Sequence, residues 1–251
     1  MDEAIELVVT LEATAPDAPT ACARWTAHDL TAHLAAGAAE MAELVEACVA
    51  GAEVRQTRDF ADREGPYVAL GDEDLRGRLV TEAVRLNMAV ESLRAKGAGW
   101  TVAFSGRPLT AAELEMHGRS EAAIHRWDLA GNDAISRELL AAPELTVHAV
   151  SVLNAMLEGS QEAVSARAQA AGLGPLRAGF AAPGTEDVVL VVDESGARLV
   201  MDDPSGRPTA TSDGATRLLA LWGRHSPAGA VRWGPDDAVS RQLAAFLWGL
   251  R

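Results

Sequence analysis

Residues 110–131 read TAAELEMHGRSEAAIHRWDLAG, and the organisation of the chain can be worked out from this stretch. Thr110 and Glu113 have the spacing of a capping box, in which a hydroxyl and a carboxylate satisfy backbone N–H groups at the start of a helix. Gly131 is typical of the position just beyond a helix. The stretch therefore predicts a helix from about residue 111 to residue 129.

The inner face of this helix carries ionisable groups where a bundle usually places apolar ones. Steps of three and four residues from Leu114 lead to His117, Glu121 and His125. Ionisable groups are costly in such a position unless they are paired or bound to a metal ion. Glu121 and His125 lie one turn apart on the same face, so they can offer an oxygen and a nitrogen to one ion.

A third ligand has to come from another helix, and His33 is the best candidate. It lies three residues after the apolar Leu30 and borders the inner face of a second predicted helix. His28 is five residues earlier, about 140° around that helix. We therefore expect His28 to face away and to be solvated.

The spacing leaves the ligand pair on the first helix open. His117 and His125 are about 12 Å apart along the helix axis, too far to share one small ion. The pair is therefore either His117 with Glu121 or Glu121 with His125. A buried hydrogen-bonded His–Glu pair without any metal explains the same pattern.

Helical periodicity covers the first two-thirds of the chain. Thr26 and Asp29 have the spacing of a second capping box, and Asp72 is the expected cap of a third helix. The polar stretch 52–71 between these two helices is predicted to be a long loop. The predicted helices cover residues 2–14, 27–49, 72–94, 111–129 and 143–170. This pattern predicts a mainly α, up-down four-helix bundle within residues 1–172.

The character of the sequence changes after Gly172. Residues 172–184 are rich in glycine and proline and are predicted to be a linker. The β-rich runs 188–192 and 198–201 flank Glu194-Ser195-Gly196 and predict a hairpin. Further short strands are expected at 208–211 and 231–233, and helices are expected to begin at Ser212 or Asp213 and at Pro235. Residues 185–251 are thus predicted to form a small α+β domain, with all strands after about residue 185. Residues 100–104 are a candidate for a short extended piece.

Composition excludes several classes of protein. The 251 residues are 48% hydrophobic and 23% charged, which is a globular balance and not that of a disordered chain. A net charge of −14 disfavours a nucleic-acid partner, because phosphates are repelled. No apolar run is long enough for a membrane helix, and the acidic N-terminus lacks the basic region of a signal peptide. We expect a cytoplasmic protein.

Cysteine and lysine usage adds two expectations. Cys22 and Cys48 are predicted to be free thiols; Cys48 is expected to be a small core residue, and no base is spaced to make Cys22 a nucleophile. Lys96 is the only lysine beside 21 arginines. This bias is compatible with a GC-rich genome, such as that of an actinobacterium.

Three motifs together resemble the mycothiol-dependent maleylpyruvate isomerase family. They are WTAHDLTAHL at 25–34, EAAIHRWD at 121–128 and LLALWGR at 218–224, in that order along the chain. The resemblance implies a DinB-like metal-binding helical bundle followed by a small sterol-carrier-like domain.

By this resemblance, the zinc ligands are His33, Glu121 and His125. The arginine that ends the third motif, Arg224, is implied to reach the site and to bind the thiol cofactor or an anionic substrate group. His117 matches no ligand of the family and is kept as a catalytic candidate, either near the metal or in contact with the substrate. The implied cofactors are Zn²⁺ or another divalent metal and mycothiol.

The chemistry implied by the resemblance is addition of a thiolate to an electron-poor double bond, rotation about that bond and departure of the thiolate. A small carboxylate-bearing substrate is isomerised from cis to trans, or receives the thiol if the thiolate does not leave. Two alternatives remain: a metal-dependent hydrolase or lyase that uses water in place of a thiol, and a non-enzymatic module that binds a metal or small molecule. Monomer and homodimer are both compatible with the sequence.

Overall fold

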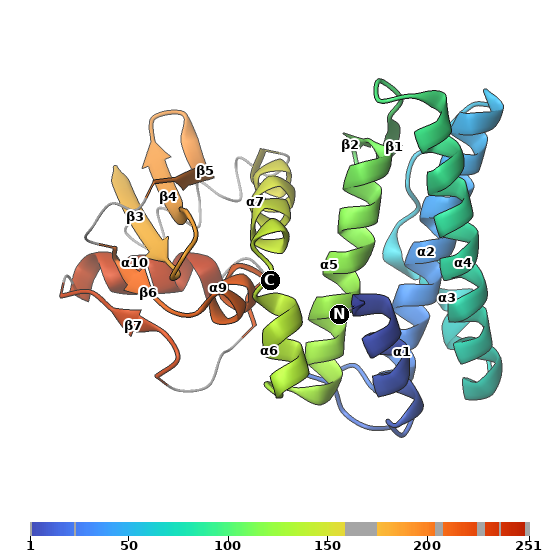
Figure 1. The fold of residues 1–251 in the computed structure, drawn as a ribbon, viewed down its shortest axis with the longest axis horizontal. Helices are drawn as coiled ribbons and strands as arrows, with labels where there is room; N and C mark the ends of the chain where they lie inside the picture. The colour runs from blue at the N-terminus through green and yellow to red at the C-terminus, as the bar shows by residue number, and fades with distance from the viewer. Residues whose placement is uncertain are drawn as a thin grey trace. The chain divides into compact units, whose positions relative to one another are not determined.

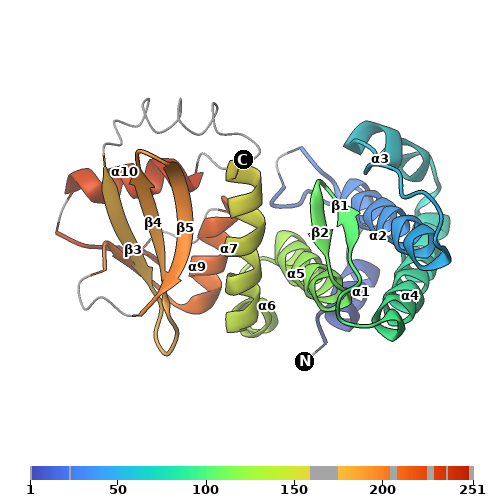
Figure 2. The ribbon, with the colours of Figure 1, turned by 90° about the horizontal axis from the view of Figure 1, so that it is seen from above.

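The structure is a computed structural model that describes residues 2–22, 24–158, 175–203, 208–224, 229–235 and 237–248. By packing, the chain forms two compact units, Met1–Asp133 and Ala134–Arg251. Figures 1 and 2 show the helical first unit and the mixed second unit. A mainly α region followed by a smaller α+β region is therefore confirmed.

Three long helices, two short helices and a small hairpin make up the described part of the first unit. The bounds of the helices are α1 (Glu3–Glu12), α2 (Ala27–Ala50), α3 (Phe60–Val68), α4 (Asp72–Lys96) and α5 (Ala111–Ala130). Helix α2 packs along α4, α1 packs on α5, and α3 packs on α2. The bundle predicted from the helical periodicity is thus formed by α1, α2, α4 and α5.

Local capping explains where the two central helices begin. The Thr26 hydroxyl accepts from the backbone N–H of Asp29, whose carboxylate accepts from the N–H of Thr26. Thr110 and Glu113 make the same reciprocal pair at the start of α5. The prediction that Asp72 caps α4 is wrong, because Asp72 is the first helical residue and Gly71 occupies the cap without a side-chain hydrogen bond.

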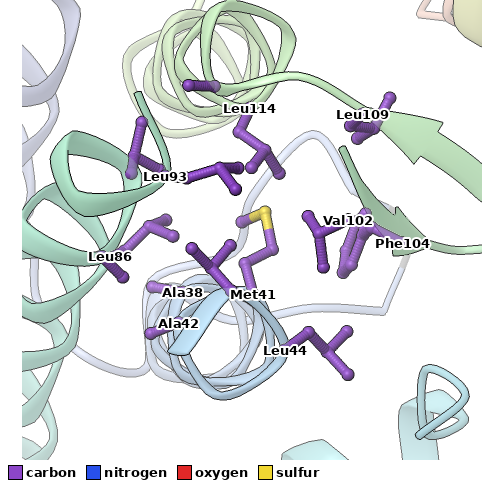
Figure 3. Close-up of a cluster of buried hydrophobic side chains, with 14 residues drawn as sticks. Ala38, Met41, Ala42, Leu44, Leu86, Leu93, Val102, Phe104, Leu109 and Leu114 are labelled. Atoms are coloured by element: carbon purple, nitrogen blue, oxygen red, sulfur yellow. The ribbon is translucent and has the colours of Figure 1, made fainter. Parts of the chain in front are cut away.

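A cluster of buried apolar side chains holds this unit together (Figure 3). Met41 of α2 lies in it, together with Leu86 and Leu93 of α4 and Leu114 of α5. Phe104 closes the cluster from the side. Burial of such side chains stabilises a fold by roughly 1.5–3 kcal/mol each, so this cluster sets the spacing of the helices.

Phe104 belongs to a hairpin that corrects one prediction. β1 (Val102–Phe104) and β2 (Arg107–Leu109) are antiparallel, so the expectation that all strands follow residue 185 is wrong. The chain turns through Ser105 and Gly106, which both have positive φ, at 49° and 77°. Two-residue hairpin turns favour such a backbone, so this Ser-Gly pair is the signal that could have revealed the hairpin.

Helix α3 corrects a second prediction, because it lies inside the stretch 52–71 that was expected to be a loop. The Asp59 carboxylate caps it by accepting from the N–H of Asp62. Gly65 and Pro66 are helix breakers by propensity. The helix forms nevertheless because tertiary packing on α2 outweighs that propensity.

The second unit contains a five-stranded sheet with helices packed on it. Its elements are α6 (Ala134–Leu140), α7 (Pro143–Glu158), β3 (Leu176–Ala181), β4 (Asp187–Asp193), β5 (Gly196–Asp202), β6 (Ala210–Thr211), α9 (Gly214–Leu221), β7 (Arg232–Trp233) and α10 (Asp237–Trp248). The strand order is β5-β4-β3-β6-β7; β3 and β6 pair in parallel, and the other described neighbours in the sheet pair antiparallel. The hairpin predicted around Glu194-Ser195-Gly196 is confirmed as β4 and β5.

The predicted linker, residues 172–184, is wrong in part, and the rest of it lies outside the described residues. Residues 176–181 were expected to be linker, but they form β3 in the middle of the sheet. Residues 159–174, which include the end of the predicted fifth helix and the start of the linker, lie outside the described residues.

Helix α7 packs with the second unit, on α9 and β5. The Asn154 amide donates to the Leu199 carbonyl at 2.7 Å, and the Leu199 N–H donates to the Asn154 oxygen at 2.8 Å. The division between the packing units therefore falls earlier in the chain than the predicted linker. In the described ranges, no single helix is long and apolar enough to cross a membrane. Helix α6 and most of α7 together have the length and apolar composition of a membrane span, but the two helices are bent by 64° where they meet.

Glu40, in the middle of α2, is a completely buried carboxylate. Arg55 Nη2 donates to it at 2.8 Å, and Arg58 donates through its backbone N–H at 2.8 Å and Nε at 2.7 Å. Burial by itself raises the pKa of Glu40, but these hydrogen bonds outweigh it and bring the pKa to about 2 from its usual 4.5. The ion pairs fasten the segment that leads into α3.

We expect Glu40→Gln to destabilise the protein by about 2–3 kcal/mol at pH 7. The folded-state pKa is depressed, so the stabilisation is fully present above pH 4.5 and is lost as the pH falls toward 2. The difference between wild type and variant should therefore shrink to about half at pH 3. Urea unfolding at both pH values measures it.

Glu43→Gln is the matched control, because Glu43 contacts the same two arginines but its side chain is 39% exposed. Its loss should cost less than about 1 kcal/mol. An equal effect of both substitutions, or a Glu40→Gln effect that does not change with pH, would contradict the assignment.

Candidate metal centre

Three of the predicted side chains converge between two helices of the first unit. His33 comes from the second turn of α2, and Glu121 and His125 come from α5. Glu121 Oε2 lies 3.6 Å from His33 Nε2 and 3.5 Å from His125 Nε2. The three potential ligand atoms lie within 4.8 Å of one another. The structure thus brings together the set that the family resemblance implies.

A second carboxylate stands behind each imidazole. His33 Nδ1 donates to Glu64 Oε1 at 2.7 Å, and His125 Nδ1 donates to Asp128 Oδ2 at 2.9 Å. A carboxylate can only accept, so in each neutral ring the proton is on Nδ1 and the Nε2 lone pair is free. Both free lone pairs point to the side where Glu121 lies.

Sequence reasoning missed both of these carboxylates. Asp128 follows His125 by three residues, the spacing at which helical side chains meet, so it could have been found. Glu64 could not, because it lies in α3, where the sequence predicted a loop. Its approach to His33 depends on how α3 packs on α2.

Aromatic rings surround the two imidazoles. The Trp25 ring centroid lies 4.9 Å from that of His33 and 6.4 Å from that of His125. Phe60, on α3, stacks on His33 with centroids 5.8 Å apart. These rings limit the rotation of His33 and keep water from its flanks.

Cys22 contacts the site through Asp128, which the sequence did not anticipate. Its Sγ donates to Asp128 Oδ2 at 3.1 Å, and the Ala21 N–H donates to the Asp128 carbonyl at 2.8 Å. Cys22, His125 and Asp128 form a second group whose ligand atoms lie within 4.8 Å of one another. Asp128 is only 3% exposed, and these contacts hold Ala21 and Cys22 against the end of α5.

The titration of the cluster is strongly coupled. Burial acts to lower the pKa of both imidazoles, but hydrogen bonds with Glu121 and Glu64 leave the pKa of His33 above its usual value. Asp128 leads the groups that hold the pKa of His125 well above its usual value. Burial acts to raise the pKa of Glu121, yet the two imidazoles hold it well below its usual value. The carboxylates of the cluster therefore favour positive charge among them, either as protons on the imidazoles or as a bound metal ion.

The other candidate histidines lie apart from this group. His117, one turn before Glu121, packs its ring 5.6 Å from that of Phe104 and adds a smaller lowering of the pKa of Glu121. His28 is not simply solvated as expected: its Nε2 is 3.1 Å from the Val68 carbonyl oxygen and its Nδ1 is 3.5 Å from Asp72.

Two further residues singled out from the sequence can be located. Cys48 packs against the apolar cluster of the first unit, in line with its expected structural role. Arg224 follows Gly223, whose φ of 69° turns the chain after α9, and its Nη1 donates to the Trp222 carbonyl at 3.3 Å.

Known proteins resemble the chain at two levels. The sequence profile of the mycothiol maleylpyruvate isomerase N-terminal domain matches residues 1–130. Among curated protein sequences, none is significantly similar to the chain.

Two solved structures share the fold at 18% identity. One is a crystal structure of the mycothiol-dependent maleylpyruvate isomerase, with a TM-score of 0.57 and coverage of 91% of this chain and 87% of that chain. The other is a histidine-to-alanine variant of the mycothiol-dependent maleylpyruvate isomerase, with a TM-score of 0.56 and coverage of 93% and 92%. The profile spans more than half of the chain and includes every residue of the cluster, so the chain belongs to the mycothiol maleylpyruvate isomerase N-terminal domain family.

Proposed function

We propose that the protein is a zinc-dependent enzyme that uses a low-molecular-weight thiol, mycothiol, to isomerise a small electrophilic carboxylate from cis to trans or to transfer the thiol to it. The observation that carries this proposal is the convergence of His33, Glu121 and His125, with both imidazoles backed by carboxylates. Membership of the family supports the thiol and the isomerase chemistry.

The donor set fits zinc or a similar divalent ion. Tetrahedral zinc has bonds of about 2.0–2.2 Å to histidine nitrogen and carboxylate oxygen, which places neighbouring ligand atoms about 3.3 Å apart. The two separations to Glu121 Oε2, 3.6 Å and 3.5 Å, are close to that value. When bound to three protein ligands, the ion supplies an open position at which the pKa of a thiol is lowered.

The protein's own residues are assigned the following roles. Glu64 and Asp128 keep each Nδ1 protonated and fix the direction of the Nε2 lone pairs, as carboxylates behind metal-binding histidines do elsewhere. Trp25 shields both rings from water. His117 is a catalytic candidate because it lies on α5 one turn from Glu121.

We assign anion recognition to Arg224. Its guanidinium is planar and can bind both oxygens of a carboxylate, which suits the substrate or an acidic group of the cofactor. The turn at Gly223 directs the chain out of α9 just before Arg224, so this side chain leaves the helix at its end.

Turnover of maleylpyruvate by the zinc-loaded protein, with and without mycothiol, tests the thiol chemistry. We expect isomerisation, or a product heavier by one thiol, only when mycothiol is present; mass spectrometry separates the two. Turnover without any thiol would favour a hydrolase or lyase that uses water. Binding of zinc and mycothiol without turnover would favour a binding module.

Substitutions of the ligands should remove the metal, whereas substitution of a carboxylate behind a ligand should only weaken its binding. We expect about one divalent metal per chain in the wild type, and loss of the metal in His33→Ala and in His125→Ala, because two ligands hold the ion poorly. Asp128→Asn should retain the site but weaken zinc binding by roughly 10–100-fold, because ring orientation is lost. Competition with a chromogenic chelator measures these affinities.

His28→Ala is the matched control on the same helix and should bind zinc like the wild type. Circular dichroism shows whether each variant is folded. Full metal occupancy in both folded ligand variants would contradict the ligand assignment.

Arg224→Ala should lower kcat/KM on the order of 100-fold while metal content and folding are preserved, as for the loss of a charged hydrogen bond worth roughly 2–4 kcal/mol. Arg224→Lys should recover only part of the activity, since lysine lacks the planar fork. Arg198→Ala, which removes an arginine paired with Asp193 on the same unit, serves as the control. If Arg224→Ala keeps wild-type kcat/KM, the residue only complements the end of α9.

A further inference from the structure

Arg63, on α3, is a buried arginine whose hydrogen-bonding groups are not used. Its side chain is only 8% exposed, although arginine is almost never buried unless it is paired. Its Nε is buried and has no hydrogen-bond partner. In the part of the chain that the structure describes, its ion-pair partner is Glu64, at 3.9 Å from Nε, which is beyond hydrogen-bond distance. A buried donor of this kind calls for an acceptor.

Two contacts place the guanidinium of Arg63 beside His33. Its central carbon lies 4.3 Å from the centroid of Phe60, whose ring stacks on His33. Glu64, the neighbouring carboxylate, accepts from Nδ1 of the same His33. Phe60, Arg63 and Glu64 follow one another at helical spacing and lie on one face of α3. All of these residues belong to the first unit, so their arrangement around the cluster is defined.

Neither neighbour satisfies the guanidinium. Glu64 Oε1 already accepts from His33 at 2.7 Å. The ring of Phe60 attracts the positive charge but offers no oxygen acceptor. A guanidinium has five N–H donors in a planar fork that fits the two oxygens of a carboxylate. A carboxylate is therefore the partner that would supply what Arg63 lacks.

The charges around the cluster point to the same class of ligand. Three carboxylates, those of Glu64, Glu121 and Asp128, lie next to the two imidazoles. A divalent ion leaves one of their negative charges uncompensated, and Arg63 compensates it. Without this arginine, an anionic substrate would approach a negatively charged cluster in a chain of net charge −14.

We propose that Arg63 binds the carboxylate of the substrate, so that the first unit holds an anion-binding residue as well as the metal ligands. This inference rests on the proposed function for the class of ligand, a small unsaturated carboxylate. It adds a residue of the first unit to the anion recognition assigned to Arg224. Arg63 binds and orients the ligand and takes no part in the making or breaking of bonds.

Binding of maleate, a small unsaturated carboxylate, to the zinc-loaded protein tests the proposal without thiol or turnover. We expect Arg63→Met to weaken maleate binding roughly 10–100-fold in isothermal titration calorimetry, because a charged hydrogen-bonded pair is lost. Arg63→Lys should recover only part of the affinity, since lysine keeps the charge but not the fork.

Arg78→Met is the matched control, because Arg78 is an arginine of the same unit whose side chain is 53% exposed and pairs with Glu82. It should bind maleate like the wild type. Thermal unfolding checks that each variant is folded. If Arg63→Met does not fold, Arg63→Lys and the wild-type spectrum described next decide the question.

The Nε–H signal of Arg63 in a proton–nitrogen correlation spectrum reports the contact directly. It is identified by its absence from the spectrum of Arg63→Lys. We expect this signal to shift on addition of maleate, with the dissociation constant that calorimetry gives, while the Nε–H signal of Arg78 stays in place. A maleate-saturated protein in which the Arg63 signal has not moved overturns the proposal.

Zinc affinity of the same variants separates ligand binding from support of Glu64. Arg63→Met should bind zinc like the wild type and maleate weakly. Weak zinc binding combined with wild-type maleate affinity of the zinc-loaded chains would show that Arg63 only holds Glu64, and would overturn the proposal. A wild type that binds no maleate, or equal maleate affinity in the wild type and both Arg63 variants, overturns it as well.

Failure of the proposed function is recognised separately. Maleate binding that depends on Arg63, in a protein without mycothiol-dependent turnover, would support the anion site and contradict the enzyme. Thiol-dependent turnover that both Arg63 variants leave unchanged would contradict the anion site and leave the enzyme standing.

Discussion

The carboxylate of Glu121 lies at the seam between α2 and α5, and the arrangement around it follows from the need to neutralise that charge. Two imidazoles approach it within 3.6 Å, and each imidazole is in turn held by a further carboxylate. Partly buried charges are tolerated only when such a chain of partners is complete. Protons on the two Nε2 atoms satisfy the Glu121 carboxylate; in their place, the same two nitrogens and the carboxylate, which lie within 4.8 Å of one another, could hold a divalent cation.

A second buried carboxylate, Glu40, links stability to this site. It lies two turns beyond His33 on α2 and fastens Arg55 and Arg58, so the backbone enters α3 in a defined place. Helix α3 then presents Glu64 to His33. The segment 52–68 is poor in helix-forming residues at its end, so these ion pairs and its packing on α2, rather than local propensity, determine where it lies.

The two faces of the bundle therefore have different chemistry. Between α2 and α5 the side chains are ionisable and closely partnered, which suits binding of an ion and a polar ligand. On the outside of α4, the exposed Val80, Val84 and Met88 lie among charged side chains such as Glu91 and Arg94.

The sequence by itself determined the bundle, the capped starts of α2 and α5 and the positions of Glu121 and His125 one turn apart, because all of these depend on helical periodicity and local hydrogen bonds. It left the choice between His117 and His125 open until a family resemblance was considered. Only the tertiary structure showed the hairpin at Ser105-Gly106, the helix α3 and the carboxylate of Glu64 behind His33. These features depend on packing between segments distant in sequence, which outweighs weak or contrary local propensities.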